Sequence, residues 1–210
     1  MKIAGGQKED GIVVGNTYDK YGSRNPVVRR IMRGFDNTLS NLIRKAAPAT
    51  IHEIGCGEGY WVLQWNGQGM TARGCDFSSQ VIEIARENAK EHGLPETLFQ
   101  PKSIYDLDAS QDKADLIVCC EVLEHLEFPE RGLEALQRVA EKHLIVSVPR
   151  EPIWCALNLV RGKYVTNWGN TPGHIQHWSK TGFTQLVSKY FDVVEIKNPL
   201  PWTMLLCRSG

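Results

Sequence analysis

The sequence predicts an α/β fold, with a doubly wound, mostly parallel sheet, helices on both faces and an antiparallel pair of strands at the end. Three observations predict this class. After residue 48, short apolar runs alternate with helical stretches, which is the pattern of parallel strands joined by crossover helices. A glycine-rich turn directly follows the first apolar run. Finally, the alternation changes within residues 179–210, where two strand-like runs follow each other closely.

The expected elements can be justified in chain order. Residues 1–15 are rich in glycine and are expected to be loose. A helix should begin after Asn25, because Asn25 can cap it and Pro26 suits the first helical position. Its apolar residues recur at helical spacing as far as Ile43, and Arg29, Arg30 and Arg33 between them are expected to form a solvated basic face. The expected strands then lie at 51–54, 71–75, 98–99, 116–120 and 143–148, with helices at 60–65, 80–92 and 129–142.

The last elements end the alternation. A helix is expected at 181–190, followed by strands at 193–196 and 203–207. The connection Asn198-Pro-Leu-Pro201 is too short for a crossover helix, so these two strands should pair antiparallel. With the five strands before them, they make a sheet of seven.

Length and composition limit the class of protein. A chain of 210 residues with 42% apolar and 23% charged residues predicts a single globular domain. The 24 basic residues equal the 24 acidic ones, which weighs against a nucleic-acid partner. The six cysteines form no CxxC pair, so we expect reduced, buried thiols in a cytoplasmic protein. We expect no signal peptide and no transmembrane segment, because no stretch approaches ~18 apolar residues.

The glycine-rich turn, Gly55-Cys56-Gly57-Glu58-Gly59, lies between an expected strand and an expected helix, where a ligand can approach the main chain. Asp76 ends the next strand, where its carboxylate can accept hydrogen bonds from both ribose hydroxyls, or can cap the following helix. The GxGxG spacing differs from the GxGxxG of dinucleotide-binding proteins. Glu58 would also place a negative charge beside a pyrophosphate, which favours a ligand without phosphates.

These residues, together with the sequence CEVLEHL at 120–126, resemble the class I S-adenosylmethionine-dependent methyltransferases, in particular the branch with the ubiquinone-biosynthesis O-methyltransferases. The resemblance covers about residues 48–150. It implies a Rossmann-like sheet and S-adenosyl-L-methionine as the cofactor, with the methionine part on the glycines, the ribose on Asp76 and the adenine near Phe77. The implied cofactor-binding residues are Glu53, Gly55, Cys56, Gly57, Gly59, Asp76, Phe77, Ser103, Ile104 and Glu121.

A group of carboxylates and histidines is the second chemical signal. Glu121, Glu124 and His125 have the spacing i, i+3, i+4, so a helical turn after the fourth strand would place them on one face. A second histidine cluster lies at 173–178. The carboxylates with one or two imidazoles can form an oxygen and nitrogen site for a divalent ion, act in catalysis or contact the substrate without a metal, or hold the structure by hydrogen bonds. The catalytic candidates are His125 as the first choice of general base, His177 as the second, and Glu121 and Glu124.

Resemblance adds one specific option for this group. The turn and a distant histidine resemble the metal site of small-RNA 2′-O-methyltransferases, which implies Glu121, Glu124, His125 and His174 as ligands of a divalent metal. His52 and His143 are flanked by strand residues, and we expect structural roles for them.

The domain should divide into four parts: an N-terminal cap segment and helix at 1–47, a cofactor-binding core at 48–148, a substrate lid at 149–178, and a C-terminal helix and strand pair at 179–210. The lid contains Trp154, Tyr164, Trp168 and Trp178, and an apolar run at 153–160 that can form a short helix.

The leading hypothesis is a methyltransferase that acts on a small-molecule acceptor at oxygen, with quinone-like, natural-product or sugar acceptors all compatible. Three alternatives stay open. The first is an RNA 2′-O-methyltransferase with a divalent metal, and the second is a nicotinamide dehydrogenase, which the glycine spacing disfavours. The third is a non-catalytic cofactor-binding module on the same fold.

Overall fold

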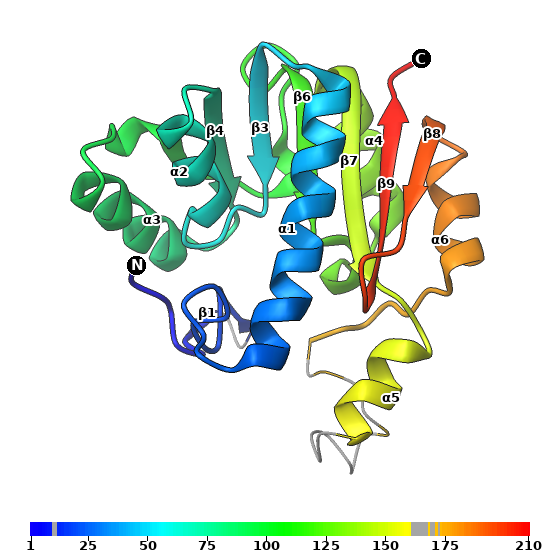
Figure 1. Ribbon diagram of the computed structural model, residues 1–210. Helices are drawn as coiled ribbons and strands as arrows, with labels where there is room; N and C mark the ends of the chain where they lie inside the picture. Colours follow the sequence, from blue (N-terminus) through cyan, green and yellow to red (C-terminus); the bar gives the residue numbers. More distant parts are fainter. Residues whose placement is uncertain (10–11, 161–167, 169–170, 172) are drawn as a thin grey trace.

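A seven-stranded sheet with the strand order β5-β4-β3-β6-β7-β9-β8 forms the centre of the computed structural model, which describes residues 1–9, 12–160, 168, 171 and 173–210 (Figure 1). The five strands from β5 to β7 pair in parallel, and β9 is antiparallel to both of its neighbours. The predicted fold class and the antiparallel final pair are therefore confirmed. The strands are β3 (Thr50–Ile54), β4 (Thr71–Asp76), β5 (Phe99–Pro101), β6 (Ala114–Cys120), β7 (Ala140–Pro149), β8 (Asp192–Lys197) and β9 (Trp202–Arg208).

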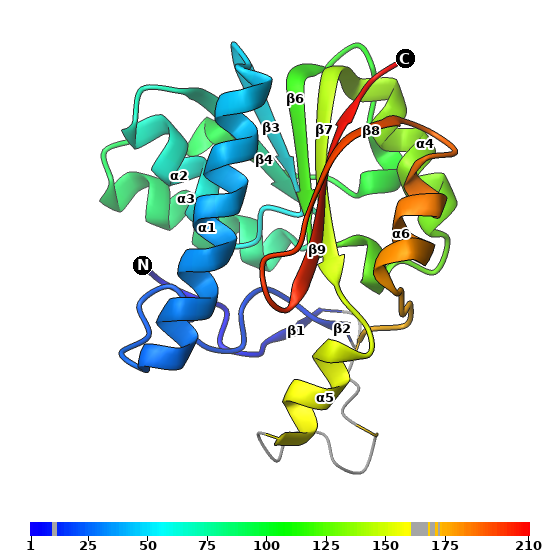
Figure 2. The ribbon, with the colours of Figure 1, turned by 45° about the vertical axis from the view of Figure 1, so that its right-hand side comes forward.

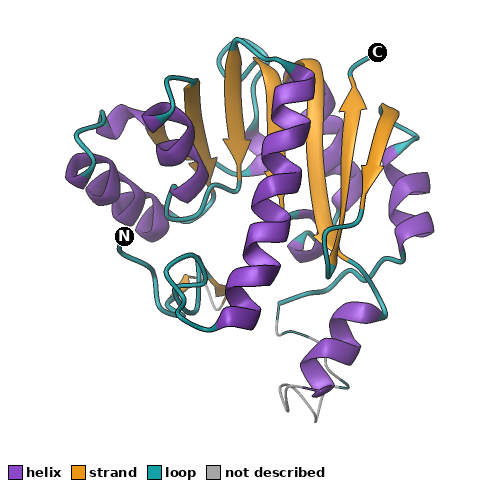
Figure 3. Ribbon diagram, in the orientation of Figure 1, coloured by secondary structure: helices purple, strands orange, loops and turns teal. Residues whose placement is uncertain are grey.

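Helices cover both faces of this sheet (Figure 2). Buried residues of α1, α2 and α3 form one core with one face, and buried residues of α4 and α6 form a second core with the other. The α-helices are α1 (Pro26–Ala46), α2 (Tyr60–Gly67), α3 (Ser79–Glu91), α4 (Pro129–Val139), α5 (Ile153–Val160) and α6 (Lys180–Val187). Short 3₁₀ turns are η1 (Glu96–Leu98), η2 (Ile104–Asp106) and η3 (Leu123–His125). Figure 3 shows how these helices and strands alternate.

Helix α1 forms for the local reasons that the sequence predicts. The Asn25 side chain accepts hydrogen bonds from the main-chain N–H groups of Val27 and Val28, and Pro26 is the first helical residue. One face buries apolar side chains such as Phe35 and Leu39. Because α1 runs opposite to the parallel strands, its first turns lie at their carboxyl ends, next to the cofactor-binding edge expected for such sheets (Figure 1).

Two expectations about the fold are wrong. The helix expected at 129–142 ends at Val139, because Ala140 already belongs to β7, which pairs with β6 on one side and β9 on the other. Residues 1–15 are not simply loose. They include the hairpin of β1 (Lys8–Glu9) and β2 (Ile12–Val13), and the side chains of Ala4 and Val14 are buried.

Helix α5 forms at the residues where a short apolar helix is expected. It lies beyond the carboxyl ends of the parallel strands (Figures 1 and 2). Tyr164 lies outside the described residues. Within the described residues, none of the helices combines the length and the apolar character needed to cross a membrane.

Candidate active site

The three glycines of the loop between β3 and α2 have backbone conformations that favour glycine, with φ of +78° at Gly55, +53° at Gly57 and +83° at Gly59. They differ in their surroundings. A Cβ atom on Gly55 would lie 2.3 Å from Val122 Cγ2, and one on Gly59 would lie 2.5 Å from Phe99 Cζ. A Cβ atom on Gly57 would meet no atom within 4 Å. The outer two glycines thus satisfy internal packing, and the main chain at Gly57 is the part left open to a ligand.

Asp76 joins this loop to the end of β4. Its Oδ2 accepts a hydrogen bond from the N–H of Gly57 at 3.0 Å, and its Oδ1 accepts one from the N–H of Ser78 at 3.1 Å. The cap of α3 is Ser78, whose Oγ accepts the N–H of Val81, so Asp76 does not cap the helix itself. Burial raises the pKa of Asp76, and the two N–H donors oppose that rise. Each carboxylate oxygen keeps a free lone pair for a further donor.

Glu58 is buried against the N-terminal segment, and its charge still acts on the proposed ligand side of the loop, because it adds to the effect of burial in raising the pKa of Asp76. The Glu58 side chain is 1% exposed. Its Oε1 accepts the N–H groups of Ala4 and Asn16 at 3.0 and 2.6 Å, and its Oε2 accepts the side-chain amide of Asn16. Glu58 therefore fastens the N-terminal segment to the glycine loop. Sequence reasoning missed this role because the partners lie more than 40 positions away.

The residues expected around the adenine lie next to Asp76. The main-chain N–H of Lys102 donates to the Asp76 carbonyl at 2.8 Å, which brings η2 beside the end of β4. Phe77 is half exposed there, and Ile104 is buried. The Ser103 hydroxyl caps η2 by accepting the N–H of Tyr105. The Cys56 side chain packs on Gly74, where a Cβ atom would lie 2.9 Å from its sulfur.

Two glutamates lie at the ends of the central strands. Glu53 on β3 is 4% exposed, and its Oε2 has no hydrogen-bond partner within the described part of the chain. Burial raises the pKa of Glu53 well above its usual range. Glu121 follows β6 with φ of +60°, an uncommon conformation for a non-glycine residue. Its carboxylate accepts hydrogen bonds from Ser147 Oγ at 3.0 Å and from Trp202 Nε1 at 2.5 Å.

Glu124, His125 and His174 form the tightest chemical cluster of the described residues, with potential ligand atoms within 4.8 Å of one another. The Glu124 side chain is only 1% exposed. Even so, neither of its carboxylate oxygens has a hydrogen-bond partner among the residues that the structure describes. Burial, and then the charge of Glu121, raises the pKa of Glu124. A buried carboxylate with two histidines beside it fits a divalent cation, which would compensate its unpaired oxygens.

The two histidines are held in a defined arrangement. His125 Nδ1 lies 2.9 Å from the carbonyl oxygen of Gly173, so Nδ1–H donates to it and Nε2 is left as the free acceptor. The two imidazole rings meet edge to face with centroids 4.8 Å apart. Burial lowers the pKa of His125, and burial with the nearby histidines lowers the pKa of His174 to about 3. Both rings are therefore neutral at pH 7, as metal ligation and proton acceptance require.

The structure places the other predicted members outside this cluster. Glu121 does not share a helical face with Glu124, because only η3 is helical and Glu121 precedes it in a left-handed conformation. His177 is close to Glu151, with 3.6 Å between Nδ1 and Oε1, and it is also near enough to His174 to help lower the pKa of that ring. The structure thus brings together three of the four proposed metal ligands, and His177, the second candidate base, lies near His174 but is not one of these three.

A contact chain of aromatic rings connects this cluster to α1. The Trp154 ring of α5 stacks on His174 with 5.8 Å between centroids, and it lies 6.1 Å from the ring of Trp202. Trp202 in turn meets Phe35 of α1 edge to face at 4.9 Å. Trp154 Nε1 also donates to Thr171 Oγ1 at 2.9 Å. Helix α5 is therefore fastened to the sheet edge directly beside His174.

A cavity of about 190 Å³ lies where the N-terminal segment, the first turns of α1 and the start of α2 meet. Its lining includes three cationic side chains and one acidic one. Tyr60 lines it as well and directly follows Gly59, so the cavity begins where the glycine loop ends. The expectation of a purely solvated basic face is incomplete, because Arg29 and Arg33 line this cavity although they are exposed. The charged residues of the lining are Lys20, Arg29, Arg33 and Asp36.

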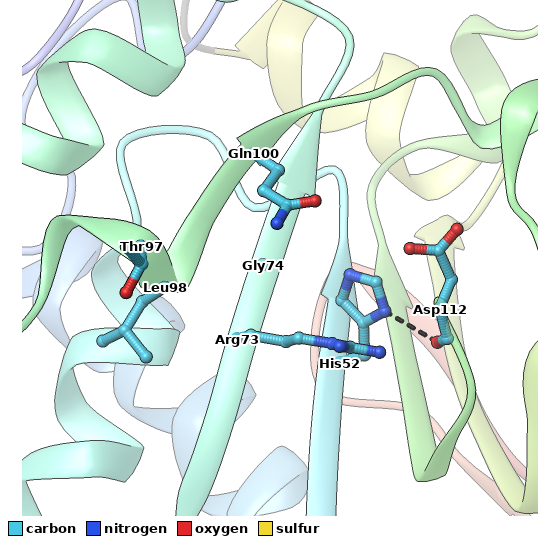
Figure 4. Close-up of a pocket in the computed structure, with 7 residues that line it drawn as sticks. All are labelled: His52, Arg73, Gly74, Thr97, Leu98, Gln100 and Asp112. Carbon is cyan, nitrogen blue, oxygen red and sulfur yellow. Dashed lines mark hydrogen bonds between the residues drawn. The ribbon is translucent and has the colours of Figure 1, made fainter. Parts of the chain in front are cut away.

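A second, much smaller cavity of about 20 Å³ lies beside β3 and β4 (Figure 4). His52 lines it, is 3% exposed, and has its Nδ1 2.9 Å from the carbonyl oxygen of Asp112. Burial lowers the pKa of His52 to about 4. These contacts agree with the structural role expected for His52.

The geometry of this sheet edge is that of a class I S-adenosylmethionine-dependent methyltransferase, with a glycine loop after the first strand and an acidic residue at the end of the second. A family model described as a methyltransferase domain matches residues 47–194. The chain therefore belongs to this methyltransferase family.

Curated relatives are similar at low identity. The ubiquinone biosynthesis O-methyltransferase of Methylobacterium sp. (strain 4-46) is 28% identical over 138 residues, which are 64% of this chain and 54% of that protein. The protein of the same name from Rickettsia conorii (strain ATCC VR-613 / Malish 7) is 28% identical over 145 residues, which are 68% of this chain and 48% of that protein. The matches thus span about half the length of these relatives.

Solved structures show the same fold. The magnesium protoporphyrin IX methyltransferase of Synechocystis PCC 6803 with bound S-adenosylhomocysteine has a TM-score of 0.67 at 18% identity, and the match covers 90% of each chain. The PH0226 protein of Pyrococcus horikoshii OT3 has a TM-score of 0.71 at 17% identity, with 92% of this chain and 96% of that chain covered. At these identities the likeness establishes the fold.

Proposed function

We propose that the protein transfers the methyl group of S-adenosylmethionine to an oxygen atom of a small-molecule acceptor. The observation that carries this proposal is the open main chain at Gly57, hydrogen-bonded at 3.0 Å to Asp76. Such a loop accepts the methionine part of the cofactor, and the Asp76 carboxylate beside it accepts hydrogen bonds from the ribose hydroxyls. The adenine would lie by Phe77, Ser103 and Ile104, next to η2.

The amino-acid end of the cofactor would enter the larger cavity. Its carboxylate is an anion, and Lys20, Arg29 and Arg33 line this cavity at the end of the glycine loop. Salt bridges between these three cations and an acidic residue are not found within the described part of the chain, although the charge of Lys20 acts on Asp36 without forming an ion pair. Glu53, implied by resemblance as a partner of the ammonium end, lies deeper at the end of β3.

The reaction is an in-line displacement at the methyl carbon. An acceptor oxygen forms the new bond to that carbon, the carbon–sulfur bond breaks, its electron pair returns to sulfur, and the hydroxyl proton leaves the acceptor. His125 is the proposed general base, because its Nδ1–H is held by the Gly173 carbonyl and its neutral Nε2 can take that proton. The protein otherwise aligns the two reactants. Glu121, held by Ser147 and Trp202, is proposed to contact the cofactor side of the same space.

A divalent metal is the alternative use of the cluster. Glu124, His125 and His174 would hold it through one carboxylate oxygen and two imidazole nitrogens. When bound, such an ion lowers the pKa of an acceptor hydroxyl. The unpartnered Glu124 carboxylate is the observation that favours this option, and RNA 2′-O-methylation is the second candidate function that would go with it.

Calorimetry with S-adenosylmethionine, S-adenosylhomocysteine and NAD tests the cofactor. We expect both sulfur ligands to bind and NAD not to bind. Binding of NAD without either sulfur ligand would overturn the proposal. Turnover is then measured with a catechol-type acceptor and with a short RNA. Methylation of the catechol supports the proposed acceptor class, methylation of only the RNA favours the second candidate, and binding without any turnover favours a non-catalytic module.

Mn²⁺ binding, followed by electron paramagnetic resonance, tests the metal without an activity assay. Glu124→Gln should abolish a specific Mn²⁺ signal, because it removes the only acidic ligand of the cluster. Glu127→Gln is the matched control, since Glu127 is a glutamate three residues away that lies outside the cluster. Full methyl transfer in EDTA, with no Mn²⁺ signal in the native protein, would leave His125 as a base in a metal-free site.

A further inference from the structure

The larger cavity is lined by one acidic side chain, Asp36, as well as by three cationic ones. The proposed function does not yet use Asp36. Asp36 lines the cavity together with Lys20, Arg29 and Arg33. The Oδ1 atom of Asp36 is buried and has no hydrogen-bond partner within the described part of the chain. A buried carboxylate oxygen without a donor is unfavourable, so such an atom in a cavity wall points to a missing donor.

The position of Asp36 on α1 places its negative charge next to the positive charges of Arg29 and Arg33 on the same helix. Arg29, Arg33 and Asp36 are spaced i, i+4, i+7, so they follow one face of the helix towards the cavity. Arg33 and Asp36 are neighbours on this face, yet no ion pair between them is found in the described structure. The wall therefore presents separate positive and negative groups at neighbouring positions, which suits a ligand that carries an anion and a cation on one carbon atom.

Asp36 keeps a charge that can hold a cation. Burial raises the pKa of Asp36 to about 6, and the charge of Lys20 opposes the rise. The carboxylate is therefore mostly ionised at pH 7. Glu53 differs, because its deeper burial raises its pKa well above the usual range and favours the neutral acid. Asp36 lines the cavity and Glu53 does not, so of these two acids Asp36 is the better placed partner for an ammonium group there.

The rings beside Asp36 support the same use. Tyr21 and Tyr60 both line the cavity and stack with 3.6 Å between centroids and 8° between planes. This stack joins the N-terminal segment to the first residue of α2, and so fixes the cavity wall relative to the glycine loop. Tyr60 directly follows Gly59, so the wall that contains Asp36 continues from the end of the glycine loop.

We propose that Asp36 binds the α-ammonium group of the cofactor, so that this cavity recognises the whole amino-acid end as a zwitterion. Lys20, Arg29 and Arg33 face the carboxylate, and Asp36 faces the ammonium. This inference rests on the proposed function, and it adds a specificity-determining residue on α1 that lies outside the glycine loop.

Binding calorimetry with four ligands tests this role at the level of single functional groups. The ligands are S-adenosylhomocysteine, its decarboxylated analogue, its deaminated analogue, and methylthioadenosine, which lacks the whole amino-acid end. Asp36→Asn keeps the shape of the side chain and removes its charge. It should weaken binding of S-adenosylhomocysteine and of the decarboxylated analogue by about tenfold or more. It should leave the deaminated analogue and methylthioadenosine within about twofold of the native affinity, since neither carries an ammonium for Asp36 to meet.

Two control variants complete the design. Asn37→Ala changes a neighbour on α1 that does not line the cavity, and it should alter none of the four affinities. Arg33→Gln should show the opposite selectivity to Asp36→Asn, with a loss for the deaminated analogue and none for the decarboxylated one. Retained binding of methylthioadenosine shows that each variant has a folded nucleoside site.

The possible outcomes separate this inference from the proposed function. If S-adenosylhomocysteine binds the native protein but Asp36→Asn binds it equally well, the role of Asp36 is overturned and the methyltransferase proposal stands. The role of Asp36 is likewise overturned if Glu53→Gln, and not Asp36→Asn, produces the loss that is specific for the ammonium. If neither S-adenosylhomocysteine nor methylthioadenosine binds the native protein, the proposed function fails, and this inference fails with it.

Discussion

The proposed cofactor side and the proposed acceptor side of the same sheet edge are built in different ways. On the cofactor side, main-chain groups of neighbouring strands meet, as where the Gly57 N–H reaches Asp76. On the acceptor side, a short turn is completed by a distant loop, because Ile175 and Gln176 donate to the Glu124 carbonyl and His125 is held by Gly173. The first arrangement depends on a compact motif, whereas the second depends on contacts about 50 residues apart.

This difference indicates which part of the site can change its specificity for a ligand. A site made of main chain and one acidic side chain tolerates little variation, because glycine conformation and strand register both determine it. The proposed acceptor side consists of side chains from η3, α5 and residues 173–178, which can vary while the sheet stays the same. We therefore expect substitutions on the two sides to have separable effects, and the following experiments test that separation.

The largest effect should come from Gly59→Ala. The new Cβ atom would lie 2.5 Å from Phe99 Cζ in a backbone with φ of +83°, so strain and overpacking add. We expect a loss of roughly 2–4 kcal/mol in the free energy of unfolding, measured by urea denaturation. Gly57→Ala is the matched control, because its φ is +53° and its Cβ atom would meet open space. It should lose only about 1–2 kcal/mol. Equal losses of unfolding free energy in both variants would show that the clash with Phe99 does not determine the loss in Gly59→Ala.

Asp76→Ala should separate the two sides most clearly. It removes the proposed ribose acceptor and the partner of the Gly57 N–H, so cofactor binding should weaken by roughly 1–3 kcal/mol. Calorimetry with S-adenosylhomocysteine measures this change, and the KM for the acceptor should stay near its native value at saturating cofactor. An unchanged cofactor affinity would contradict the ribose role of Asp76.

Trp154→Ala should have a smaller effect, and on the opposite side. It removes the ring that stacks on His174 and the Nε1 donor to Thr171. We expect transition-state stabilisation to fall by about 1–2 kcal/mol in kcat/KM for the acceptor, with S-adenosylhomocysteine affinity unchanged. Trp168→Ala is the control, because Trp168 is 83% exposed. A parallel loss of cofactor affinity in Trp154→Ala would show that the two sides are not separable.

The smallest effect is expected at a contact between α4 and η2, beside the proposed adenine site. The Arg131 guanidinium lies over the ring of Tyr105, 5.6 Å from its centroid, and over the ring of Phe128 at 5.7 Å. Arg131→Met should lower the free energy of unfolding by only about 0.5 kcal/mol, since Phe128 is half exposed. Cofactor and acceptor affinities should both stay at the native values. A change in either affinity would mean that η2 and α4 transmit more between the sides than their contacts suggest.

The sequence predicted most of the fold because its signals are local. The cap at Asn25, the turn at Gly55–Gly59 and the short connection before β9 depend on residues close together in the chain. The predicted boundary between α4 and β7 was wrong because strand pairing with β6 and β9, and not helical periodicity, decides residues 140–142. The hairpin in residues 1–15 was missed because its burial depends on Glu58 and on α3.

For the candidate site, the chain on its own determined the chemistry that is available: a glycine-rich loop, an acidic residue one strand later, and carboxylates with histidines after the fourth strand. Tertiary structure alone decided which of these groups meet. It turned Glu58 towards the N-terminal segment, kept Glu121 and Glu124 from sharing a helical face, and joined His174 to His125 across the sheet edge. It also placed Asp36 in one cavity with three cations. The physical reason is that backbone conformation is set by neighbouring residues, whereas the burial and partners of a charged side chain depend on elements far away in the chain.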